Sequence, residues 1–152
     1  MPYTSADARQ QLIDSIGVAI EQLAIALASL SELYERLDEN AADAVEESLF
    51  RPVQLAYGRA RAAHSAFAQR YALPARTFAQ APPVSPSLSA GALLQSAVEA
   101  VAQADGEIAE LQDSMLPVEV GDRELRAELE GVRMLLDAIP ARAREIQRTL
   151  GR

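Results

Sequence analysis

Apolar side chains recur every three or four residues over most of the 152-residue chain. This spacing places them along one face of an α-helix, as in the seam of a coiled coil. The first stretch ends near Asp38. Its seam consists of Ile13, Ile16, Ile20, Leu23, Leu27, Leu30, Tyr34 and Leu37. We therefore predict one long first helix, of about 34 residues and roughly 50 Å.

Three further stretches repeat the pattern. Their seams run from Val45 to Phe67, from Ala90 to Met115 and from Leu125 to Leu150. Ser87 or Ser89 is the predicted N-cap of the third helix, and Asp122 that of the fourth. Pro52 and Pro140 fall inside the second and fourth seams. Each proline removes a helical hydrogen bond, so we predict kinks near both.

A proline-rich segment, about 73–88, separates the second and third seams. It divides the chain into a helical hairpin at about 5–72 and another at about 89–150. Leu73, Phe78 and Val84 indicate a linker that packs over one end of the domain, and a mobile flap is the alternative. Together the seams predict an all-α, antiparallel up-down-up-down four-helix bundle that forms a single domain over 1–152.

Composition narrows the chemistry. Cysteine is absent, which excludes disulfides and a cysteine nucleophile, and all 14 basic residues are arginine. We expect no cofactor. Met1–Asp7 lack a basic region followed by an apolar one, and no run of about 18 uninterrupted apolar residues exists. We therefore expect a cytoplasmic protein without a membrane-spanning helix.

The net charge of −8 is distributed unevenly. Residues 1–50 hold ten acids and two arginines, whereas residues 51–81 hold five arginines and no acid. In an up-down-up-down bundle the basic stretches of the second and fourth helices meet at one end. The candidate residues for an anionic ligand there are Arg61, Arg70, Arg76, Arg142 and Arg148. The overall acidity makes nucleic acid an improbable partner.

The single histidine, His64, follows Arg59 by five residues. This arginine-x4-histidine spacing resembles the motif of the HEPN ribonucleases, which are also all-α bundles. The resemblance covers six residues, and Ala60 stands where that family commonly has a polar residue. It implies RNA cleavage, usually across a dimer, in which His64 is the general acid or base and Arg59 stabilises the phosphate charge.

Acidic triplets end the first and third helices and are the candidate metal ligands: Glu32, Glu35 and Asp38, and Glu107, Glu110 and Asp113. Related spacings occur in the MazG-type nucleotide pyrophosphohydrolases, a resemblance that implies magnesium or manganese. At 100° per residue only Asp38 and Glu107 lie near their seams, and the other carboxylates face outward. Core-facing ligands belong on the seam, so we interpret the triplets as solvated faces.

The pattern favours a non-catalytic interaction module that forms a homodimer or small homo-oligomer. Apolar residues outside the seams widen the apolar faces of the helices, which favours contact with another molecule. Val18 and Ile25 lie to one side of the first helix and are expected to form an intermolecular face, while a wide core stripe in a monomer is the competing explanation. The alternatives are the ribonuclease and a binder of small anions at the arginine-rich end.

Overall fold

The computed structural model describes residues 5–120 and 122–150. All regular elements within these residues are helical, with no strand among them, so the all-α prediction is confirmed. In chain order they are α1 (Ser5–Arg36), α2 (Glu39–Val45), η1 (Glu46–Phe50, a π-helical turn), α3 (Arg51–Arg70), α4 (Ala90–Asp113), α5 (Leu116–Val120), α6 (Arg123–Leu136) and α7 (Ile139–Leu150).

The predicted seam of α1 lies in the core. Ile16, Ile20 and Leu23 are at most 1% exposed. Leu12 and Leu33 lie beside the seam and are also fully buried, because α1 packs against both α3 and α4. Tyr34 is the exception: it lies on the seam and is exposed. The wide apolar stripe of α1 therefore serves mainly the core of one chain.

The helical bonding pattern changes just before Pro52. The N–H of Arg51 bonds to the carbonyl of Glu46, five residues back, which defines the π-helical turn η1. Pro52 has no N–H to offer to the carbonyl of Ser48, four residues earlier. That carbonyl accepts a hydrogen bond of 3.2 Å from Nη1 of Arg142. The helical hydrogen bonds are therefore disrupted where the sequence predicts it. That the helix axis also bends there stays a prediction.

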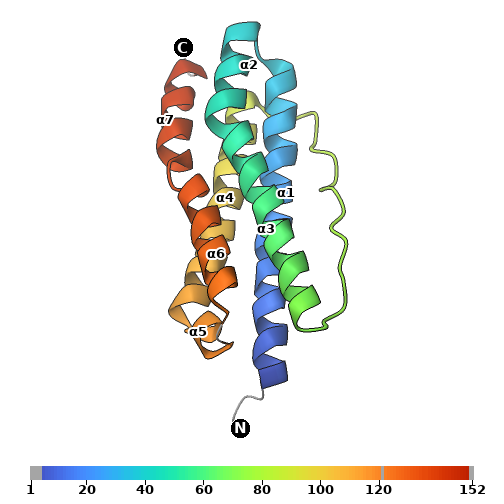
Figure 1. Cartoon of the computed structure of the whole chain (residues 1–152). Coiled ribbons are helices and arrows are strands. Elements are labelled where there is room, and N and C mark those ends of the chain that lie inside the picture. Colours follow the sequence, from blue (N-terminus) through green and yellow to red (C-terminus); the bar gives the residue numbers. More distant parts are fainter. Residues whose placement is uncertain (1–4, 121, 151–152) are drawn as a thin grey trace.

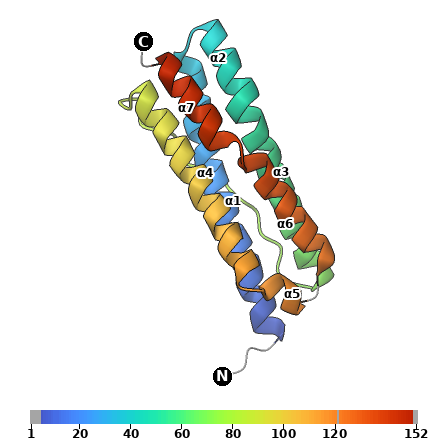
Figure 2. The ribbon, with the colours of Figure 1, turned by 90° about the vertical axis from the view of Figure 1, so that its left-hand side faces the viewer.

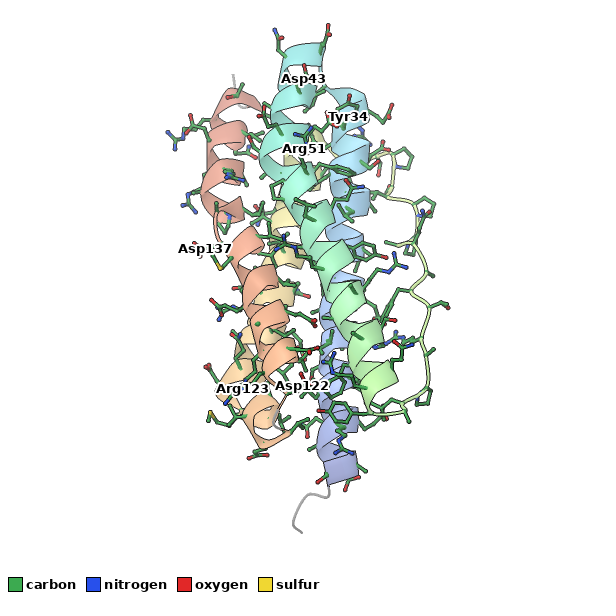
Figure 3. All side chains as sticks on the ribbon, viewed as in Figure 1. Tyr34, Asp43, Arg51, Asp122, Arg123 and Asp137 are labelled. Carbon is green, nitrogen blue, oxygen red and sulfur yellow. The ribbon has the colours of Figure 1, made fainter. Side chains whose placement is uncertain are left out.

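The predicted fourth helix is divided in two near Pro140. α6 ends at Leu136 and α7 begins at Ile139. Pro140 therefore lies in the first turn of α7, where a missing N–H costs least. Figure 3 shows Asp137 at the break between the two helices.

The order of helix directions differs from the predicted alternation. α1 runs up and α3 runs down, but α4 also runs down and α6–α7 return upward (Figures 1 and 2). Arg36, at the end of α1, donates hydrogen bonds to the carbonyls of Leu88 and Pro86, just before α4 begins. The up-down-up-down order is therefore wrong. The reason is the linker: about 16 extended residues reach roughly 50 Å, enough to travel the length of the molecule.

Residues 73–88 are called the strap from here on. The strap rises along the outside of α1 and α3 in Figure 1. Its apolar residues Leu73, Phe78, Val84 and Leu88 are half-buried against the core. The prediction that the linker packs onto the domain is confirmed, but it covers a side of the molecule and not one end.

By length and composition alone, α1 is apolar enough to cross a membrane. The sequence predicts no such helix when only uninterrupted runs of apolar residues are considered. In the window that meets the criterion, 56% of the residues are buried inside the fold, as expected for a core helix. The absence of a membrane-spanning helix therefore stays a prediction.

Candidate functional site

The five arginines proposed to bind an anion do not meet at one end. Arg70 is the last residue of α3, which ends at the lower end of the molecule, and Arg76 follows in the strap, whereas Arg142 and Arg148 belong to α7, which lies at the upper end (Figure 1). The predicted arginine-rich end is wrong because it rested on the up-down-up-down order. With α4 running down, the last helix returns to the end where α1 finishes.

Each of these arginines also has a partner within the chain. Arg61 lies over the ring of Tyr57, with its Cζ 5.3 Å from the ring centroid. Arg76 pairs with Glu21 and lies 4.5 Å over the ring of Phe78. The remaining contacts are Arg70 with Asp122 and Glu124, Arg142 with the carbonyl of Ser48, and Arg148 with Glu145. These contacts stabilise the fold and leave fewer donors for a ligand.

His64 and Arg59 face different neighbours. His64 is 4% exposed and contacts Phe78 of the strap edge-on, with ring centroids 5.0 Å apart. Arg59 lies against α6, where its Nη1 would be 3.7 Å from a Cβ placed on Gly131. Five residues turn a helix by about 140°, which accounts for the separation. Within one chain the geometry does not bring the two groups to one phosphate, and a site shared between two chains stays a prediction.

The two candidate metal ligands are also apart. Asp38 caps α2 and accepts a hydrogen bond of 2.9 Å from the N–H of Ala41. Glu107 lines a hollow beside α1 together with Asp7, Asp14 and Val18. Within the part of the chain that the structure describes, no group of three or more histidine or acidic residues could hold a metal ion.

A small cavity of about 260 Å³ lies beside His64, between α1, α3 and the start of the strap. Gln10 and Asp14 line it from α1, and Leu73 to Arg76 line it from the strap. Nε2 of Gln10 donates a hydrogen bond of 2.9 Å to Asp14, which fixes that carboxylate. Burial first, and then the charge of Arg76, lower the pKa of His64 below its ordinary value of 6.5, while Asp14 opposes the shift. Burial and Arg76 therefore favour the neutral form of the imidazole.

Sequence reasoning missed this cluster. Asp14 precedes His64 by 50 residues and reaches it because α1 packs against α3, and Arg76 joins them because the strap folds back over α1. The one available signal is the unusual content of the strap, where Arg76 and Phe78 stand among prolines and small residues.

A second buried polar cluster joins α3 to α6. Asp122 is 5% exposed and caps α6 by accepting from the N–H of Leu125 at 2.8 Å, so its predicted capping role is confirmed. It also accepts from Arg70 and from the hydroxyl of Tyr71. Burial alone would raise the pKa of Asp122, but these hydrogen bonds and the guanidinium keep it below 3.8. Figure 3 shows Asp122 near the lower end of the molecule.

Comparison with protein-family models, with curated proteins and with solved structures gave no significant match. The proposals that follow therefore depend on the residues of this chain alone.

Proposed function

We propose that the chain is a non-catalytic four-helix-bundle interaction module that forms a homodimer or small homo-oligomer in the cytoplasm. The observation that carries the proposal is a pair of exposed apolar residues on α1. Val18 is 44% exposed and Ile25 is 38% exposed, on a helix whose other large apolar residues are mostly buried. Seven residues make nearly two full helical turns, so the two side chains lie on one stripe.

The core does not account for this pair. Of the apolar residues that widen the seams, Leu12, Leu33 and Leu93 are fully buried. Val18 and Ile25 remain in contact with solvent. Val18 borders a hollow of about 520 Å³ that Glu107 of α4 closes on the other side. A contact surface centred on α1 with a recess beside it suits the insertion of a side chain from a second copy.

The charges around the pair make the proposal specific. Asp14 is exposed on α1, and Glu107 lies across the hollow. A two-fold symmetric contact presents the same surface from both copies, so it brings these carboxylates together. Salt screens such repulsion. We therefore expect self-association through this face to strengthen as the salt concentration rises.

The test is native mass spectrometry combined with sedimentation velocity at low and high salt. Val18→Glu and Ile25→Glu should each convert the oligomer into a monomer. Leu55→Glu is the matched control, because Leu55 is 51% exposed but lies on α3. A wild-type protein that stays monomeric at every salt concentration would contradict the proposal. So would equal effects of the α1 and α3 variants.

The two alternative functions receive less support from the geometry. A ribonuclease needs Arg59 and His64 at one phosphate, and they face α6 and the strap respectively. An anion binder needs clustered arginines, and these are divided between the two ends. Neither alternative gains an observation of its own.

A further inference from the structure

The strap is attached to the domain at two places. At its upper end Arg36 of α1 donates to the carbonyls of Leu88 and Pro86. At its lower end Arg76 pairs with Glu21 of α1, and Phe78 packs edge-on against His64 of α3. Between the two places, strap residues Gln80 and Ala81 line a cleft of about 340 Å³ together with residues of α1 and α3.

The lower attachment is closely fitted. A Cβ placed on Gly17 of α1 would lie 2.5 Å from Nη1 of Arg76 and 3.8 Å from the ring of Phe78. A larger residue at this position would require the guanidinium to shift. The same guanidinium lies 4.5 Å over the ring of Phe78. The guanidinium of Arg76 over the ring of Phe78, and Phe78 edge-on to His64, therefore form one continuous contact beside α1.

This contact places a titratable group beneath the strap. Two elements pack against His64, and each contributes one charge that faces it. The strap contributes the positive charge of Arg76, α1 contributes the negative charge of Asp14, and both side chains line the cavity beside His64. Glu21 of α1 pairs with Arg76, and Gln10 holds Asp14 in place.

We infer that the strap is a pH-sensitive cover over the side formed by α1 and α3, and that protonation of His64 releases it. A charged imidazole beneath the strap is buried and faces Arg76, and both conditions are unfavourable. When the strap leaves, Arg76 leaves with it and water reaches the imidazole. Asp14 stays, because it belongs to α1. Opening therefore removes the repulsive charge and retains the attractive one.

The open state uncovers a mostly apolar surface. Ala24, Leu27 and Ala28 of α1 face Phe50 of η1 and Tyr57 of α3 across the cleft that the strap covers. This inference does not depend on the proposed self-association, because Val18 and Ile25 are exposed with the strap closed.

The absence of native cysteine allows a direct measurement. Cysteines are introduced at two exposed positions, Ala79→Cys in the strap and Ala102→Cys in α4, and labelled with nitroxides. Pulsed electron–electron double resonance then measures the distance between the two labels. We expect a single narrow distance at pH 7.5. A second, broad population should grow several-fold as the pH falls below 6.5. In the same pair with His64→Gln the distance should not change between pH 7.5 and 5. An unchanged wild-type distance, or an equal change in His64→Gln, would overturn the inference.

A second measurement decides the matter should His64→Gln fail to fold. The single imidazole gives one set of NMR signals, so its titration in the full chain is unambiguous. Coupling is reciprocal: if protonation loosens the strap, then loosening the strap must favour protonation. Phe78→Ala should therefore move the pKa of His64 upward toward 6.5, while Thr77→Ala, at an exposed neighbour, should leave it unchanged. A pKa that Phe78→Ala does not move would overturn the inference.

Discussion

Arg70, at the end of α3, donates two hydrogen bonds to one carboxylate oxygen of Asp122, the residue that caps α6. The Nη2 and Nε distances to Oδ2 are 2.9 and 3.0 Å. The other oxygen, Oδ1, accepts from the N–H of Leu125 at 2.8 Å. One buried carboxylate thus begins a helix and joins it to a neighbour that lies 52 residues earlier in the chain.

The Asp122→Ala variant should therefore lose more stability than a cap alone provides. Loss of an N-cap costs about 0.5–2 kcal/mol, and removing one partner of a buried ion pair about 3–5 kcal/mol. The side chain of Arg70 is 29% exposed, so water partly replaces its lost partner. We expect a loss of about 2–3 kcal/mol in the free energy of unfolding, measured with urea. Glu124, the other carboxylate bound by Arg70, has a side chain that is 74% exposed. Glu124→Ala should therefore cost less than about 0.5 kcal/mol.

Acid should weaken the same contact. The pKa of Asp122 lies below 3.8 in the folded chain, so the unfolded chain takes up this proton first as the pH falls. The stabilisation is complete at pH values well above 3.8. It is lost as the pH falls through 3.8 toward the pKa of the folded state. Urea unfolding from pH 6 to pH 2.5 should show this loss in the wild type and a shallower slope in Asp122→Asn. Equal slopes would show that the carboxylate does not contribute in this way.

Helix positions were largely predictable because they depend on neighbours within a few residues. Ser89 and Asp122 cap α4 and α6 as predicted. The seam residues of α1 before Tyr34 are buried or half-buried. Tyr34 is exposed although it lies on the seam. The spacing of a seam shows which face of a helix is apolar, but it does not show how far along the helix a neighbouring helix covers that face.

The arrangement of the helices could not be predicted in the same way. Heptad spacing does not show whether the linker makes a short turn or travels the length of the molecule, because both arrangements can bury most residues of the seams. The predicted arginine-rich end failed with that choice. Arg70 pairs with Asp122 and Arg76 with Glu21, contacts between residues more than 50 positions apart that follow from helix order alone.

The close approach of the strap to Gly17 predicts how three glycine substitutions will differ. Gly58 and Gly106 lie inside α3 and α4, with no atom within 4 Å of an added Cβ. Replacing either with alanine should stabilise the protein by about 0.5–1 kcal/mol, because alanine favours the helix. Gly17→Ala should gain less, because the Cβ displaces the guanidinium of Arg76 from Glu21. Urea unfolding of the three variants gives the comparison. A gain for Gly17→Ala as large as for Gly58→Ala would argue against a close contact at Arg76.

Two helices are each followed by a residue whose backbone conformation is strained. Ala72 follows α3 with a φ of 54°, and Met115 follows α4 with a φ of 65°. At the first of these ends, the N–H of Leu73 bonds to the carbonyl of Ala68 at 2.8 Å, which requires the left-handed turn at Ala72. Glycine adopts this conformation without the steric cost that a Cβ imposes.

Ala72→Gly and Met115→Gly should therefore each stabilise the protein, by up to about 1 kcal/mol. Ala102→Gly, at an exposed position inside α4, is the opposite control and should destabilise by about 1 kcal/mol. Ala72 also begins the path of the strap, so a gain from Ala72→Gly would show that the left-handed turn belongs to the folded state. If Ala72→Gly destabilised the protein as much as Ala102→Gly, the chain would not make a left-handed turn at Ala72. The course of the strap along α1 and α3, which depends on that turn, would then be wrong.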